Sequence, residues 1–306
     1  MKKLLLIVLS AAVLFAVAAG CKKVIPSEPG YPTPTFTPTL TPVPGLAFTI
    51  PSTGVINRVN FDGTGTTPVT ATVSSLYSVS NISKNGKIAY VRYDTHMLYL
   101  MNTDGTGNTQ LVYSGQNNSP TISSDGMRVV YTKYVTQNDI YYVNTSTHAE
   151  TDLSAFTGQA GYYPALSANG QNIVYNAGND IVIMDATGGN RNTVWTHTGS
   201  DYATTACLSP DAKLIAFIHN AGAPDYFKIA VMNNDGSGLT DVYPLGNVNP
   251  GAMRWLPVAN KILFEANLTG LGMDIWAIDP DGGNLKNLTN ISILGADCFM
   301  DWYVTD

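Results

Sequence analysis

Residues 209–217 read Ser-Pro-Asp-Ala-Lys-Leu-Ile-Ala-Phe, a tight polar turn followed at once by an apolar strand. The same pattern begins at Ser83, Ser123 and Ser167, and in a degraded form at Leu256. Asp, Asn and Gly suit tight turns because they tolerate a positive φ, and β-branched and aromatic residues suit strands. The pattern therefore predicts a repeated unit built on a hairpin.

A second turn marks the same unit further along the chain. Asp-Gly pairs begin at positions 62, 104, 235 and 281, and Ser-Thr at 146 and Thr-Gly at 187 replace them in two copies. A period of about 40–45 residues with four short strands is that of a β-propeller blade. The composition agrees, since 28 Gly, 17 Tyr and only three Glu favour turns and strands over helices.

The repeats account for residues 45–306. Five complete copies begin near Tyr77, Asn117, Gly161, Tyr202 and Asn249. A sixth is split between the two ends of this region, as Gly45–Ile50, Val55–Phe61, Pro68–Val73 and Ala296–Val304. Because an open sheet edge invites aggregation, we expect the last strand to close the ring. The prediction is an all-β, six-bladed propeller of four-stranded antiparallel blades, closed by a C-terminal strand that pairs with the N-terminal blade.

One repeat is similar to those of a known family. Residues 274–289 read Asp-Ile-Trp-Ala-Ile-Asp-Pro-Asp-Gly-Gly-Asn-Leu-Lys-Asn-Leu-Thr, which resembles the TolB-type (WD-like) propeller repeats of bacterial envelopes. The resemblance implies the six-bladed fold without the amino-terminal domain of TolB. It does not specify function, because these repeats also occur in peptidase and sugar-lyase propellers.

The first 44 residues have the features of a targeting signal followed by a tether. A basic start and an apolar run from Leu4 to Ala19 predict a signal peptide over 1–20. Cys21 follows Ala-Ala-Gly and resembles the lipidated cysteine of bacterial lipoproteins, with an ordinary signal peptide as the alternative. No Asp follows Cys21, which by the same resemblance implies the outer membrane, on its periplasmic or surface side, in a two-membraned bacterium. Residues 21–44, rich in Thr and Pro, predict an extended tether.

Catalytic and metal-binding patterns are not evident in the sequence. The four histidines show no metal-ligand spacing, and no Gly-x-Ser-x-Gly nucleophile elbow occurs. The net charge of −6 argues against a nucleic-acid partner. We therefore predict that the protein is not an enzyme and carries no cofactor or metal.

A binding face is the predicted functional feature. In a propeller, the loops that enter the innermost strands and those between the second and third strands share one face. Tyr supplies rigid contact area and a hydroxyl, which suits protein or glycan contacts. The candidate residues on this face are Tyr77, Arg92, Tyr93, Tyr134, Tyr162, Tyr163, Tyr202, His219, Asp225, Glu265 and Asp297.

These observations predict an exported lipoprotein, attached to the membrane only through its lipid anchor. Its propeller is expected to bind another envelope protein without catalysis. A surface carbohydrate-binding module is the first alternative. A hydrolase or lyase with its site at the channel mouth is the second.

Overall fold

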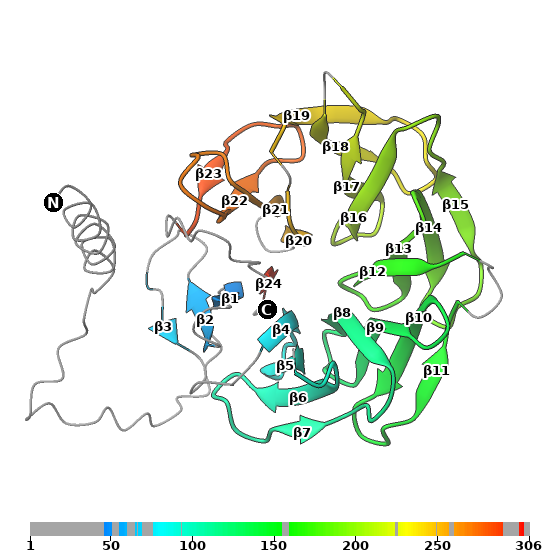
Figure 1. Ribbon diagram of the computed structural model, residues 1–306, viewed down its shortest axis with the longest axis vertical. Helices are drawn as coiled ribbons and strands as arrows, with labels where there is room; N and C mark the ends of the chain where they lie inside the picture. Colours follow the sequence, from blue (N-terminus) through cyan, green and yellow to red (C-terminus); the bar gives the residue numbers. More distant parts are fainter. Residues whose placement is uncertain are drawn as a thin grey trace, which may run out of the picture. The chain divides into compact units, whose positions relative to one another are not determined.

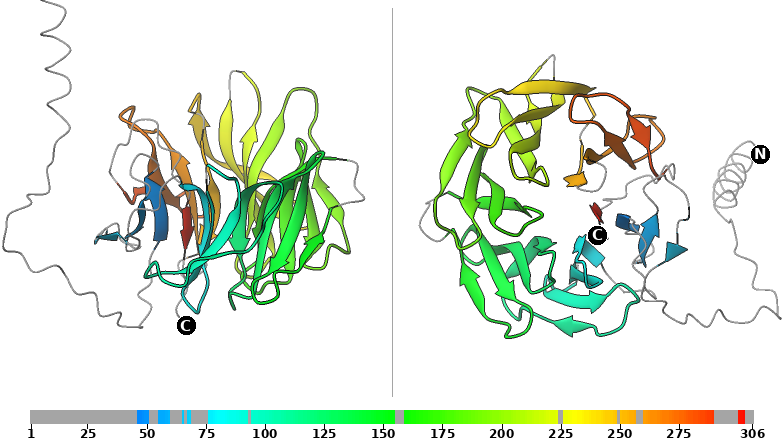
Figure 2. Two further views of the ribbon diagram at one scale, coloured as in Figure 1. Left: turned by 60° about the horizontal axis from the view of Figure 1, so that its bottom comes forward. Right: turned by 180° about the vertical axis from the view of Figure 1, so that it is seen from behind.

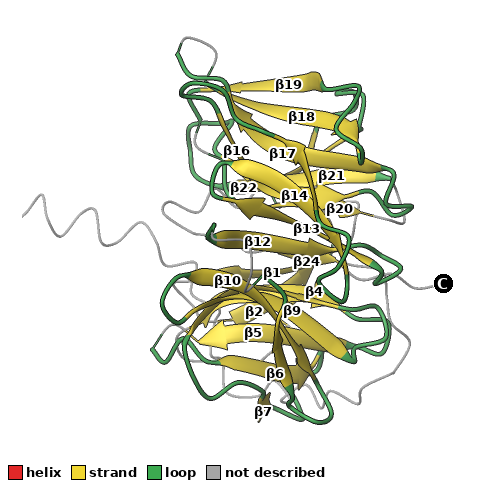
Figure 3. Cartoon of the chain, turned by 90° about the vertical axis from the view of Figure 1, so that its right-hand side faces the viewer, coloured by secondary structure: helices red, strands yellow, loops and turns green. Residues whose placement is uncertain are grey.

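The computed structural model describes residues 46–50, 55–59, 65, 67–68, 76–92, 94–154, 159–223, 226–248, 250–256, 260–289 and 300–302. Every regular element in these ranges is a β-strand (Figure 3). Within them, no helix is long and apolar enough to cross a membrane. The predicted lipidation site, Cys21, lies outside the described residues, as do the predicted signal peptide and tether.

Five blades are each built from one continuous segment of chain. Blade 1 contains β4 (Leu76–Ile82), β5 (Lys87–Arg92), β6 (Leu98–Asn102) and β7 (Thr109–Gln110). Blade 2 contains β8 (Gln116–Ile122), β9 (Arg128–Tyr134), β10 (Asn138–Asn144) and β11 (Glu150–Asp152). Blade 3 contains β12 (Gly161–Leu166), β13 (Asn172–Ala177), β14 (Asp180–Asp185) and β15 (Asn192–Trp195). Blade 4 contains β16 (Tyr202–Leu208), β17 (Leu214–Asn220), β18 (Phe227–Asn233) and β19 (Thr240–Gly246). Blade 5 contains β20 (Met253–Leu256), β21 (Lys261–Ala266), β22 (Asp274–Ile278) and β23 (Lys286–Asn287).

The prediction of a six-bladed propeller is wrong, because the structure has five blades in its described residues. Only five blades come from continuous segments; the remaining sheet combines β1 (Leu46–Ile50), β2 (Val55–Val59), β3 (Thr67–Pro68) and β24 (Met300–Trp302) in the order β24-β1-β2-β3. This terminal sheet differs from the blades because its innermost strand, β24, is only three residues long and is far from β1 in the sequence. Its closing contact is antiparallel, with Leu46 opposite Trp302 and Phe48 opposite Met300.

The sheets stand around a common centre, with β4, β8, β12, β16, β20 and β24 innermost (Figures 1 and 2). In each of the five blades, the second strand carries an aromatic residue at the same position. These side chains are at most 1% exposed, because each blade packs between two neighbours: Tyr90, Tyr131, Tyr175, Phe217 and Phe264. The repeat therefore buries one large ring per blade, and this burial is a main source of stabilisation.

The polar turn between the first and second strands has the same hydrogen bonds in four blades. In blade 3, the Ser167 hydroxyl donates to Asn169 Oδ1 at 2.7 Å and accepts from the backbone N–H of Asn172 at 2.9 Å. Equivalent bonds centre on Ser83, Ser123 and Ser209. The serine is buried in every copy, so the turn is held from inside and starts the second strand in register.

The turn between the third and fourth strands joins this same end of the blade. Its backbone N–H donates to the first turn in four blades, for example from Asn234 to the carbonyl of Lys213 at 2.8 Å. Its glycine also approaches the preceding blade, since a Cβ on Gly236 would lie 2.1 Å from the carbonyl oxygen of Val194. We call the end of the ring that carries these two sets of turns the turn face. The opposite end, which carries the remaining loops, is the loop face.

Candidate binding face

The strand register places the predicted binding residues at the loop face. Each inner strand starts beside the end of the second strand of its blade, as in the pairs Gln116–Tyr134, Tyr162–Asn176 and Tyr202–Asn220. The described candidates that this arrangement brings to one end of the ring are Arg92, Tyr134, Tyr162, Tyr163, Tyr202, His219 and Glu265.

Four candidates are not placed in this way. Tyr93, Asp225 and Asp297 lie outside the described residues. Tyr77 belongs to β4, at the same end of its blade, but its side chain is outside the described part of the chain.

A β-bulge shapes the inner strands at this face. The register shifts in β8, β12 and β16, and one residue in each bulge has a positive φ: Ser119 at 48°, Tyr163 at 50° and Thr205 at 50°. Such a bulge re-aims the side chains beside it. Tyr163 is 40% exposed, and its ring centroid lies 6.2 Å from that of the half-buried Tyr162. Alternation of strand residues does not reveal these bulges, because non-glycine residues occupy the left-handed positions.

Exposed apolar side chains are concentrated at this end of the ring. Eight large apolar or aromatic residues are exposed in the described part of the chain. Met127 and Leu239 lie at the turn face, whereas the other six belong to the loop face or to segments that enter its inner strands: Tyr113, Tyr134, Val135, Tyr163, Tyr226 and Leu271. Only two of these six, Tyr134 and Tyr163, are among the residues predicted from the sequence for the binding face.

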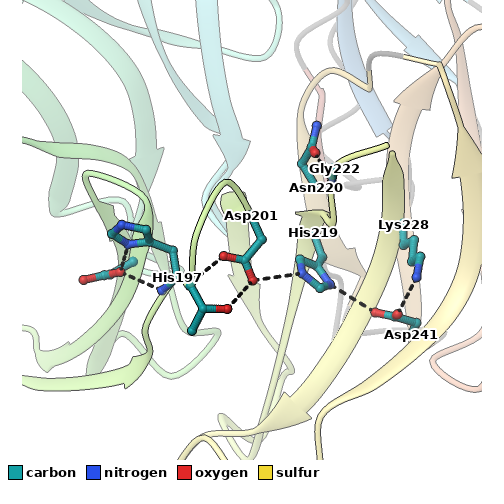
Figure 4. Close-up of polar contacts among 9 residues, drawn as sticks. His197, Asp201, His219, Asn220, Gly222, Lys228 and Asp241 are labelled. Carbon is teal, nitrogen blue, oxygen red and sulfur yellow. Dashed lines mark hydrogen bonds and ion pairs between the residues drawn. The ribbon is translucent and has the colours of Figure 1, made fainter. Parts of the chain in front are cut away.

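His219 lies in a charged cluster between blades 3 and 4 (Figure 4). Its Nδ1 is 3.3 Å from Asp241 Oδ1, and its Nε2 is 3.9 Å from Asp201 Oδ2. The Trp195 ring of blade 3 packs edge-on against the imidazole, with centroids 5.6 Å apart. The His219 side chain is only 13% exposed, so it holds the segment before β16 against blade 4 and offers little surface to a partner.

Two further contacts complete this cluster. Lys228 donates to Asp241 at 3.0 Å in blade 4 (Figure 4), and His197 Nδ1 lies 2.6 Å from Asp180 Oδ1 within blade 3. Burial alone would raise the pKa of Asp241, but the hydrogen bonds and positive charge of Lys228 and His219 outweigh it and lower that pKa. The cluster therefore keeps Asp241 ionised and fixes the loop.

Glu265 is also buried rather than presented to solvent. It is 2% exposed, and its Oε2 accepts from the backbone N–H of Ala252 at 3.2 Å. A Cβ on Gly251 would lie 2.1 Å from the same oxygen, so the chain before β20 needs glycine there. Glu265 positions this segment of the loop face.

A partly buried ion pair in blade 2 was not foreseen from the sequence. The Lys133 ammonium contacts Glu150 Oε2, donates to Ser114 Oγ at 3.1 Å and lies 5.1 Å from the Tyr141 ring centroid. Tyr131 donates to the same Glu150 oxygen at 2.7 Å. Burial, then the hydrogen bond to Glu150, raise the pKa of Tyr131, so it remains a donor. The pair links the second strand of blade 2 to its fourth strand and to Ser114 in the segment before β8.

Carboxylates, histidines and cysteines do not gather in a set of three able to hold a metal ion within the described ranges. Asp201 lies beside Nε2 of His219 and Asp241 lies beside Nδ1, so the two carboxylates and the imidazole do not converge on one metal-binding position.

The family comparison matches residues 79–295 with the TolB beta propeller domain. The chain belongs to this family. The resemblance of the repeats to TolB-type propellers is thereby confirmed at the level of the family. None of the curated proteins matches this TolB-family chain significantly.

Solved structures agree on the architecture. TolB from Acinetobacter baumannii is 19% identical with a TM-score of 0.68, over 85% of this chain and 66% of that one, slightly under two thirds of its length. A chain of a nidogen/laminin complex is 11% identical with a TM-score of 0.69, over 85% and 98% of the two chains. An oligogalacturonate lyase in complex with manganese is 16% identical with a TM-score of 0.52, over 79% and 71%. At these identities the likeness establishes the fold.

Proposed function

We propose that this TolB-family propeller is a non-catalytic scaffold that binds another protein of the cell envelope through its loop face. In the same proposal, the chain is exported and anchored in the envelope by lipid on Cys21. The observation that carries the binding role is the unequal distribution of exposed apolar side chains, six at the loop face and two at the turn face in the described residues.

Exposed apolar groups that gather on one surface are typical of interaction sites. Tyr is favoured at such sites because it offers a large rigid ring and a hydroxyl while losing little entropy on binding. The supports beneath the loop face add to this argument. The bulge at Tyr163, the His219 cluster and the Lys133–Glu150 pair fix the backbone before a partner arrives, which reduces the ordering cost of association.

The comparisons supply a consistent context. One matched propeller was solved in a nidogen/laminin complex, so a fold of this kind occurs in a protein–protein assembly. Another was solved as a manganese-bound lyase, which makes an enzyme the alternative to exclude.

Photo-crosslinking in intact source cells tests the scaffold. A photoreactive residue at Tyr163 or Leu271 should give the same discrete adduct with one envelope protein. The matched controls are Met127 and Leu239, which are similarly exposed but lie at the turn face. Equal adducts from all four positions, or none from the loop face, would refute the proposal.

Two further measurements address the anchor and the absence of catalysis. Metabolic labelling with a fatty acid should disappear in Cys21→Ala, and persistent label would refute lipidation there. The purified protein should not cleave polygalacturonate in the presence of manganese. Accumulation of the ultraviolet-absorbing unsaturated product would refute the non-catalytic role.

A further inference from the structure

A small polar cavity opens at the loop face where blade 1 meets blade 2. Its volume is about 180 Å³, which corresponds to roughly six water molecules. Its walls come from the loop after β5, the start of β8 and the loop between β9 and β10. The lining residues are His96, Gln116, Asn117, Asn118, Tyr134 and Asn138.

Asn117 is a buried residue of the cavity wall, held in place by hydrogen bonds. It is 1% exposed, and its Nδ2 donates to the carbonyl of His96 at 2.7 Å and to that of Ser114 at 3.3 Å. These two bonds identify the nitrogen and so fix Oδ1 as the acceptor. Asn117 Oδ1 is buried and accepts no hydrogen bond in the described structure. A buried acceptor in this state is costly unless a ligand or water donates to it.

The rest of the lining consists of His96, amides and one tyrosine, and it contains no carboxylate, Lys or Arg side chain. Gln116, Asn118 and Asn138 add three groups that can both donate and accept. The Tyr134 side chain is 44% exposed at the cavity edge and offers a ring face as well as a hydroxyl. The nearest strand partner of Asn117, Lys133, is paired with Glu150, so its charge is already compensated.

We propose that this cavity is a binding subsite for one sugar residue of a neutral glycan. A sugar presents several hydroxyls that donate and accept together, which matches four amides and a phenol. Its C–H face would pack on the Tyr134 ring. The cavity holds one ring of this size, and its open side leaves the rest of the glycan in solvent.

Other ligand classes fit the lining less well. A divalent cation prefers carboxylate oxygens, and an anion prefers Arg or Lys; the cavity lining contains none of these side chains. A peptide side chain would meet some of the amides but would leave the others without partners. The inference goes beyond the scaffold role and does not depend on it, because the crosslinking positions Tyr163 and Leu271 do not line this cavity.

A glycan array carrying neutral and acidic glycans tests the subsite directly. The full chain is kept in a detergent without a sugar headgroup, since such a headgroup would compete. We expect retention of at least one neutral glycan and a measurable affinity for it by isothermal titration. Gln116→Ala, Asn138→Ala and Tyr134→Ala should each weaken binding about three- to tenfold, the effect of losing one hydrogen bond or stacking contact.

Matched controls separate the cavity from general surface effects. Tyr113→Ala removes an exposed tyrosine outside the lining, and Gln171→Ala removes an exposed glutamine at the turn face. Both should bind like the unmodified protein, and circular dichroism should show that all five variants are folded. Failure to retain any glycan, retention of acidic glycans alone, displacement by a peptide but not by free sugar, or equal losses in the controls would each overturn the proposal.

Discussion

Replacing Ser123 by alanine tests the hydrogen-bonded turn that recurs in four blades. The buried Ser123 hydroxyl donates to Asp125 Oδ1 at 2.6 Å and accepts from the backbone N–H of Arg128 at 3.0 Å. Ser123→Ala removes both bonds and leaves that N–H without its acceptor. Ser167→Ala removes the same pair in blade 3, where the acceptor of the hydroxyl is the uncharged Asn169.

The expected magnitudes differ because one partner is ionised. A neutral hydrogen bond contributes about 0.5–1.5 kcal/mol, and one to a charged group about 1.5–3 kcal/mol. Asp125 is exposed, so solvent reduces its share to the lower part of that range. We expect losses of about 2–3 kcal/mol for Ser123→Ala and about 1–2 kcal/mol for Ser167→Ala.

The pH dependence distinguishes the two variants further. The hydrogen bond from Ser123, followed by that from the Met127 N–H, lowers the pKa of Asp125. A carboxylate with a lowered pKa stabilises the fold above its unfolded pKa of about 3.9 and loses that contribution as the pH falls through its folded value. The cost of Ser123→Ala should therefore be constant above about pH 5 and shrink below about pH 4, whereas that of Ser167→Ala should not change over this range.

Urea unfolding followed by circular dichroism measures these free energies. Ser146→Ala is the control, because this exposed serine donates no side-chain hydrogen bond in the described structure, and its effect should stay within about 0.5 kcal/mol. The m-values must remain equal for the comparison to hold. Costs for Ser123→Ala that match the control, or that do not vary with pH, would contradict the role given to the turn.

Three more variants probe contacts between and within blades. In urea unfolding, Gly236→Ala should destabilise the protein by at least about 2 kcal/mol more than Gly246→Ala. Both glycines have a positive φ, but only at Gly236 would a Cβ lie against a backbone carbonyl. Equal costs for the two variants would contradict this steric argument. Lys228→Met should raise the pKa of Asp241 toward its ordinary value, as measured by carboxyl carbon NMR, with an unchanged pKa as the opposing result. Lys133→Met should lower the free energy of unfolding by about 2–3 kcal/mol because it leaves Glu150 without its cation; the loss is smaller than for a fully buried pair because Glu150 is 27% exposed. Adding Glu150→Gln should recover part of this loss. If the effects of the two substitutions simply add, the pairing is contradicted.

The repeat could be recognised from the sequence because each copy has the same polar turn followed by an apolar strand. The turn at Ser167 depends on residues within five positions, and the inward position of Tyr175 follows from the alternation of its strand, so turn chemistry and alternation predict both. The prediction erred in counting the sheet formed by the two ends of the repeat region as a sixth blade. Strand length depends on how far partners extend, and the short β3 and β24 carry no clear end signals.

The face was predicted in position but not in detail. Register follows from the repeat, which is why Tyr134 and Tyr163 could be assigned to one end. The burial of Glu265 depends on the close approach of Gly251, and the pairing of Lys133 with Glu150 joins the second strand of a blade to the fourth. Contacts of this kind are set by tertiary packing, so they leave no periodic trace in the sequence.

In the proposed function, the turn face stabilises the fold and the loop face binds the partner. At the turn face, a serine, its Asx partner and a glycine recur because each copy must satisfy the same backbone groups and fit against the next blade. At the loop face, β-bulges and the Lys133–Glu150 ion pair fix the backbone, so the exposed side chains there contribute little to stability. That freedom allows each loop to differ, and it accounts for the amides that gather between blades 1 and 2 beside the exposed Tyr134. A substitution of an exposed side chain at the loop face should therefore change binding more than stability, whereas a substitution in the hydrogen-bonded turns of the turn face should change stability more than binding.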